Sequence, residues 1–113
     1  MAQWTEITEL SEWEAALEGS DQQPFVILKH STTCPVSASA LEEFEAYLEE
    51  APNETHKYLL VKVIESRPVS NQIAEDLQVK HASPQIILVK NKEQGWNTSH
   101  WSITEKHIKA VLD

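Results

Sequence analysis

The only cysteine of the chain, Cys34, is the residue best suited to nucleophilic chemistry. It follows a polar turn that ends at Thr33, and it directly precedes Pro35. Proline is favoured in the first turn of a helix, where the N–H that it lacks would have no partner. We therefore predict Cys34 at a helix start, where free N–H groups and the helix dipole favour the nucleophilic thiolate. The alternative is a small apolar residue of the core, a common place for free cysteines.

Ser37 stands three residues after Cys34, where a dithiol enzyme would carry its second cysteine. A dithiol site resolves its own mixed disulfide, whereas a site with one cysteine needs a thiol from another molecule. The spacing therefore indicates monothiol chemistry. The Ser37 hydroxyl can hydrogen-bond the thiolate, or it can be an ordinary residue of a helix N-terminus.

Two further positions are candidates for the same site. Ser83 and Pro84 precede the strand expected at 85–89, and proline at the entry to a buried strand indicates an edge position or a cis bond. His30 ends the strand that leads to Cys34, and an imidazolium close to the sulfur would favour thiolate. The alternative for His30 is a surface or hydrogen-bonded histidine.

Strand and helix patterns alternate along the chain and would position these residues. We expect strands at 4–7, 25–28, 58–64, 85–89 and 96–101, the last after a hairpin turn at 91–95. We expect helices from Ser11 to Gly19, from Pro35 to before Pro52, and at 70–77 and 104–112. Ser11 with Glu14 has the spacing of a capping box, and Gly19 suits a C-cap. The order β-α-β-α-β-α-β-β-α predicts one α/β domain over 1–113, with a mixed central sheet and helices on both faces.

Composition and charge exclude several functions. The formal net charge of −9 repels nucleic acid and anionic lipid surfaces. One cysteine permits no internal disulfide, and no histidine pair has helical metal spacing, which argues against structural zinc. The apolar runs are four residues long, too short to span a bilayer. The N-terminal residues lack the features of a signal peptide, so we expect a cytoplasmic protein.

Two segments together resemble a known family. Lys29–Ser37, read as KHSTTCPVS, and His81–Gln85, read as HASPQ, are similar to the monothiol bacilliredoxins (the YtxJ-like family) of the thioredoxin superfamily. The resemblance implies a thioredoxin fold and a cytosolic thiol-disulfide oxidoreductase that removes bacillithiol from S-bacillithiolated proteins. It implies that Cys34 is the nucleophile and Pro84 a cis-proline. Other bacilliredoxins carry two cysteines, and this chain does not.

The resemblance also implies the remaining components of the reaction. Bacillithiol would be a co-substrate, with no tightly bound cofactor. The partners would be client proteins, bacillithiol and a separate bacillithiol disulfide reductase, and we expect a monomer that binds neither nucleic acid nor membranes. The residues that we expect to bind substrate around Cys34 are His30, Thr33, Pro35, Ser37, Ser83 and Pro84.

Charge and substrate choice leave alternatives open. Bacillithiol carries carboxylates, so we expect local basic residues near Cys34, with Lys29, His30, Lys80 and His81 as candidates. Strand alternation places Lys29 and His30 on opposite faces of the sheet, so they would not both help. The same exchange chemistry would also serve glutathione or coenzyme A. A non-enzymatic thioredoxin-like binding module, with Cys34 idle, is the other alternative.

Overall fold

A mixed five-stranded sheet forms the centre of the computed structural model, which describes residues 3–50 and 52–112. Its strands are β1 (Thr5–Glu6), β2 (Phe25–His30), β3 (Lys57–Lys62), β4 (Gln85–Lys90) and β5 (Glu93–Ser99), in the spatial order β1-β3-β2-β4-β5. β1, β3 and β2 are parallel, whereas β4 and β5 are antiparallel additions. The predicted mixed sheet and the predicted element order are confirmed.

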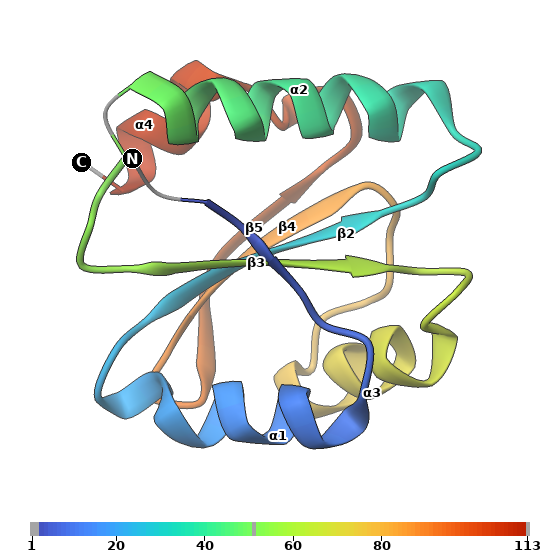
Figure 1. Ribbon diagram of the computed structural model, residues 1–113, viewed down its shortest axis with the longest axis vertical. Helices are drawn as coiled ribbons and strands as arrows, with labels where there is room; N and C mark the ends of the chain where they lie inside the picture. Colours follow the sequence, from blue (N-terminus) through green and yellow to red (C-terminus); the bar gives the residue numbers. More distant parts are fainter. Residues whose placement is uncertain (1–2, 51, 113) are drawn as a thin grey trace.

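Helices cover both faces of this sheet (Figure 1). They are α1 (Leu10–Glu18), α2 (Pro35–Glu50), α3 (Arg67–Leu77) and α4 (Glu105–Leu112), with short 3-10 turns at Gly19–Asp21 and His100–Ser102. α2 and α4 lie on one face, and α1 and α3 lie on the other. Within the described ranges, none of the helices has the length and apolar character needed to cross a membrane.

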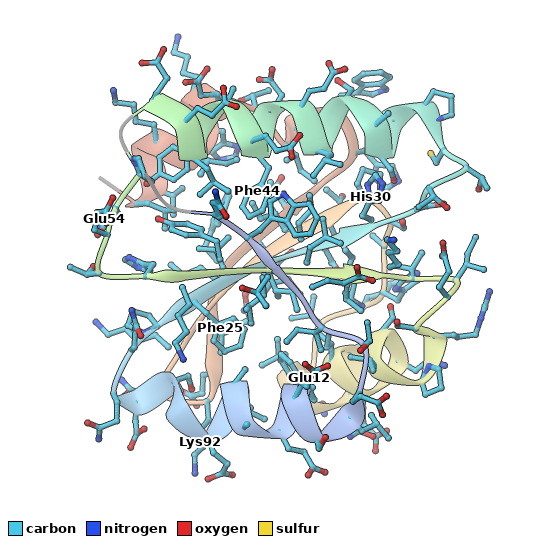
Figure 2. The ribbon with its side chains drawn as sticks, viewed as in Figure 1. Glu12, Phe25, His30, Phe44, Glu54 and Lys92 are labelled. Atoms are coloured by element: carbon cyan, nitrogen blue, oxygen red, sulfur yellow. The ribbon has the colours of Figure 1, made fainter. Side chains whose placement is uncertain are left out.

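The central strand β2 is buried along its whole length, because both of its faces meet helices. Phe25 and Ile27 pack with Trp13 of α1 in one cluster, whereas Val26 packs with Phe44 of α2 in the other. Figure 2 shows Phe25 and Phe44 on opposite sides of the sheet. Successive residues of a strand point to opposite faces, so an apolar run is what a strand between two helical layers requires.

The first helix begins earlier than the Ser11–Glu14 pair predicts. Glu9 is the N-cap of α1, and the Glu12 carboxylate accepts hydrogen bonds from the backbone N–H of Thr8 and of Glu9, both at 3.0 Å. The sequence therefore holds two pairs with capping spacing, and the earlier pair satisfies the free N–H groups. The predicted C-cap at Gly19 is confirmed.

The hairpin between β4 and β5 is tighter than predicted. Its turn consists of Asn91 and Lys92, with φ angles of 54° and 65°, rather than the segment 91–95. Two-residue hairpin turns with positive φ match the twist of the strands, and asparagine tolerates that conformation. β5 consequently starts at Glu93, and it ends at Ser99 instead of Trp101.

The connection from β3 to α3 also differs from the prediction. β3 ends at Lys62, two residues before the predicted end, and α3 begins at Arg67, three residues before Ser70. Pro68 lies in the first turn of α3, where its missing N–H costs no helical hydrogen bond. Because α3 begins at Arg67, this residue lies at the edge of the sheet at which β2 and β3 end.

Candidate thiol site

Cys34 lies after the turn 31–33 that follows β2, and immediately before α2, as predicted. Its backbone N–H donates to the Ser31 carbonyl oxygen at 3.3 Å, and its carbonyl accepts from the N–H of Ala38 at 3.1 Å. The second bond is the first of the helix, so Cys34 stands at the N-cap position of α2. The thiol is partly exposed. It therefore lies where parallel strands end, the usual position of ligand sites in α/β sheets.

The first turn of α2 stabilises the thiolate of Cys34. The backbone N–H of Ser37, and then that of Val36, donate hydrogen bonds to the sulfur and hold its pKa below the ordinary value of a cysteine. The Ser37 hydroxyl also lowers the pKa of Cys34, by a smaller amount, whereas burial raises this pKa. Pro35 has no N–H to offer, so the donors come from the two following residues. The physical result is a thiol that ionises more readily than a free cysteine.

Ser37 is completely buried, and its Oγ has no other hydrogen-bond partner among the described residues. Buried hydroxyls are normally paired, so an Oγ that lacks a full hydrogen bond and contributes to the lowered pKa of Cys34 is placed to donate to the thiolate. This geometry favours the interpretation of Ser37 as a thiolate ligand over that of an ordinary helical serine.

His30 lies between the sheet and α2 (Figure 2), on the face of β2 from which Val26 and Leu28 pack against that helix. The side chain is 8% exposed, and Nδ1 has no partner within the described part of the chain. Burial lowers the pKa of His30, although the Ser37 backbone partly offsets this effect. Burial therefore favours the neutral form of the ring. This counts against the hypothesis of an imidazolium beside the thiol, because desolvation penalises the charged form.

Ser83 and Pro84 reach the same edge of the sheet from a different part of the chain. Gln85, the first residue of β4, pairs with Lys29 of β2, five positions before Cys34. The Ser83–Pro84 bond is cis, as predicted, and the Pro84 carbonyl accepts from the N–H of His100 at 3.0 Å. The Oγ of Ser83 is buried without a partner among the described residues.

Thr33 lies in the exposed turn that carries Cys34. Its Oγ1 is 3.3 Å from the Oγ of Ser31, and the neighbouring Thr32 Oγ1 donates to Glu65 Oε2 at 3.2 Å. The second contact links the Cys34 turn to the loop after β3. All of the predicted site residues therefore lie at the carboxyl edge of the parallel strands.

The basic candidates separate into buried and exposed groups. Lys29 is completely buried on the α1 and α3 side, so it cannot contact a dissolved ligand, whereas Lys80 and His81 are exposed. Sequence reasoning missed two cations at this edge. The charge of Lys62 lowers the pKa of His30, and that of Arg67 contributes to the lowered pKa of His81. Lys62 is the last residue of β3, and Arg67 follows the carboxyl end of that strand; this position is the signal that would have identified them.

A cluster suited to metal binding does not occur in the parts of the chain that the structure describes, where no three His, Cys, Asp or Glu side chains converge. The described chemistry at this edge is that of a thiolate with hydrogen-bond donors around it. It matches thiol-disulfide exchange, in which one S–S bond forms as another breaks.

Comparison with known proteins agrees with this site. A structure described as an oxidoreductase with a thioredoxin fold superposes with a TM-score of 0.82 at 30% identity, covering 96% of this chain and 92% of that one. Thioredoxin from Malassezia sympodialis matches with a TM-score of 0.80 at 15% identity, covering 99% and 90%. Thioredoxin from Fasciola hepatica matches with a TM-score of 0.74 at 13% identity, covering 99% and 96%.

The fold is therefore the thioredoxin fold, and its single cysteine defines a monothiol member of the class. The sequence profile of the monothiol bacilliredoxin family BrxC matches residues 5–108. The chain belongs to that family, as the segments around Cys34 and Pro84 predicted, and this supports a monothiol thiol oxidoreductase.

Proposed function

We propose that this chain removes bacillithiol from S-bacillithiolated proteins through Cys34. The observation that carries the proposal is the stabilised thiolate of Cys34 with a buried serine, Ser37, at the position of a resolving cysteine. Membership of the monothiol bacilliredoxin family points to bacillithiol as the small thiol. A site with one thiol can attack a mixed disulfide but needs an external thiol to be regenerated.

The proposed reaction has two exchange steps. The Cys34 thiolate attacks the bacillithiol sulfur of the client disulfide, so that a Cys34–bacillithiol bond forms and the client leaves as a thiolate that takes a proton from water. A second bacillithiol thiolate then attacks the bacillithiol sulfur on Cys34. This step releases bacillithiol disulfide, which a separate reductase would consume, and it restores the Cys34 thiolate.

The surroundings of Cys34 supply the remaining roles in this proposal. The N–H groups of Val36 and Ser37 stabilise the attacking and the leaving Cys34 thiolate. The exposed cations Arg67 and Lys80 would attract the carboxylates of bacillithiol, and the backbone of Ser83 would bind the extended client chain. Thr33, Pro35 and the neutral His30 would border the small thiol.

The proposal includes a cellular setting. Both steps need reduced thiols, and cytoplasm keeps thiols reduced, so we place the reaction there. One thiol per chain suffices for the cycle, so we propose that the protein acts as a monomer without a tightly bound cofactor.

The test compares three modified forms of one client protein with a single cysteine. The client carries bacillithiol, glutathione or coenzyme A, and each reaction is supplied with the free form of the small thiol that its client carries. Loss of the modification from the client is followed by intact mass. We expect repeated turnover to be fastest with bacillithiol, and Cys34→Ser to be inactive. Faster turnover with glutathione or coenzyme A would identify another small thiol as the substrate. Equal rates for Cys34→Ser and wild type, or no turnover of any client, would favour the non-enzymatic binding module.

A further inference from the structure

A buried lysine lies beneath the loop that leads to Pro84. Lys29 is 0% exposed in the central strand β2, and it is not in either of the ion pairs found among the described residues. Burial without a carboxylate penalises the ammonium and lowers its pKa to about 8. A methionine of similar length would fill this space without that penalty. Replacing buried charged groups by apolar ones is often neutral or stabilising.

The contacts of the ammonium join three segments. Nζ of Lys29 donates to the backbone carbonyl of Ser70 in α3 at 3.1 Å, and it lies 3.1 Å from Nδ1 of His81. An ammonium has no acceptor, so Nδ1 of His81 accepts and the ring proton lies on Nε2. His81 is exposed, and it belongs to the loop 78–84 between α3 and β4. The strand that leads to Cys34 is therefore tied directly to that loop.

A second buried group holds the same loop. Gln85 is 3% exposed and pairs with Lys29 across the β2–β4 ladder. Its Nε2 donates to the carbonyl of Lys80 at 3.1 Å. Two consecutive loop residues, Lys80 and His81, are thus held by two adjacent buried side chains of the sheet. The loop ends in Ser83 and Pro84, next to which a client chain would lie.

We propose that Lys29 is a positioning residue for thiol-disulfide exchange. It acts through His81 to hold the loop 78–84 in the position in which a bound client chain can reach Cys34. This inference rests on the proposed attack of Cys34 on client disulfides, but it does not depend on which small thiol the client carries. The role of Lys29 is therefore to place the loop rather than to stabilise the folded protein.

The test separates recognition of a chain from the reactivity of the thiol. Two disulfides are compared: an extended peptide whose central cysteine carries thionitrobenzoate, and the symmetrical aromatic disulfide of thionitrobenzoate without a peptide. In both, Cys34 forms one S–S bond as another breaks and a thiolate leaves, and the Cys34 adduct is followed by intact mass. The readout is the ratio of the peptide rate to the aromatic disulfide rate, with melting temperature measured alongside.

Lys29→Met should lower this ratio about tenfold, the size expected for one hydrogen bond to a charged group. His81→Ala should lower it similarly, and the double variant should be no lower than either single one, because both remove the same contact. Lys29→Met should melt at or above the wild-type temperature. Lys109→Met, which removes an exposed lysine of α4, is the control and should leave the ratio unchanged.

An unchanged ratio in Lys29→Met overturns the proposal, as does a fall that accompanies lost thermal stability and is absent in His81→Ala. If Lys29→Met does not fold, His81→Ala decides alone, because its side chain is exposed. The ratio requires neither bacillithiol nor turnover. A wild-type protein that reacts with the peptide but ignores a bacillithiolated client would therefore refute the proposed function without affecting this result.

Discussion

Cys34 is held as a thiolate by hydrogen bonds that belong to the first turn of α2. Its alkylation by iodoacetamide should therefore titrate below about 8.5, the value of a free cysteine. Ser37→Ala removes the hydroxyl but keeps the N–H donors, so the midpoint should rise by a fraction of the full shift. The measurement is the alkylation rate against pH. A wild-type midpoint at or above the free-cysteine value would contradict the stabilised thiolate.

Ser37→Cys should change the chemistry from monothiol to dithiol. Ser37 is buried beside the Cys34 sulfur, and a thiol there could attack a Cys34 adduct from within the molecule. Well-placed groups react at very high effective concentration, so the variant should form an internal disulfide and lose the adduct quickly. Intact mass should instead show a stable adduct on the wild type when free thiol is withheld. Repeated wild-type turnover without any small thiol would rule out the monothiol mechanism.

Lys29 should give the free energy of unfolding a distinctive pH dependence. Its pKa is about 8 in the folded protein, below the ordinary 10.5 of a lysine. Between these values the unfolded chain binds more protons than the folded one, so wild-type stability should rise with pH relative to Lys29→Met. Below pH 8 both states carry the charge, and the difference should be constant. Urea titrations from pH 6 to pH 10.5 measure this, and parallel curves throughout would contradict a buried ammonium.

Among the elements, α1 (with Ala16 and Leu17 packed beside it) has one fully buried side chain, Trp13, that attaches it to α3 and the sheet. Trp13 is 0% exposed, and its ring packs edge-on against that of Phe25 with 5.7 Å between the ring centroids. Its Nε1–H donates to Asp76 Oδ2 at 2.8 Å. Trp13→Ala should lower the free energy of unfolding by about 3–5 kcal/mol, the range for large aromatic-to-alanine changes in cores. Denaturant titration measures this.

Trp13→Phe is the matched variant for that helix, because it keeps most of the apolar volume and loses the hydrogen bond to Asp76. Its destabilisation should lie clearly below that of the alanine variant. Since α1 lies on the face away from α2, the alkylation rate of folded Cys34 should stay the same. A loss of stability equal in both variants would show that the hydrogen bond, rather than packing, attaches α1.

At the scale of the whole molecule, a net charge of −9 opposes the cations Lys62 and Arg67, which act on His30 and His81 at the edge of the sheet that carries Cys34. The Debye length is about 10 Å at 0.1 M salt, so local charges should dominate there. Arg67→Gln should therefore slow the reaction of Cys34 with an anionic aromatic disulfide more than its reaction with neutral hydroxyethyl disulfide. Raising the salt towards 1 M should shrink this difference.

Lys109→Gln is the control for that experiment, because it changes the net charge equally from the last turn of α4. The adjoining end of α4 contacts the loop before β3, where Asn53 donates to the Leu112 carbonyl, at the opposite end of the sheet from Cys34. Equal slowing by the two variants would show that total charge, rather than the cations at the site, governs the reaction.

Much of this molecule was determined by local signals in the sequence. The element order followed from apolar runs that alternate with helical patterns, and Cys34 before Pro35 marked the start of α2. Those signals act between residues a few positions apart, so the chain itself carries them. Boundaries such as the start of α1 were wrong because two capping pairs, at Glu9–Glu12 and Ser11–Glu14, satisfy the same local rule.

The tertiary structure decided the electrostatics of the site, that is, which charged and titratable side chains are buried and which lie near one another. Lys29 and His30 are adjacent in sequence, yet they lie in different surroundings. The ammonium of Lys29 is buried against His81, whereas the imidazole ring of His30 is desolvated beneath α2. Arg67 joins the site only because β3 and β2 are parallel and end at one edge. Burial and charge depend on residues that are distant in sequence but close in space. No local pattern records these distances, so the folded arrangement had to supply them.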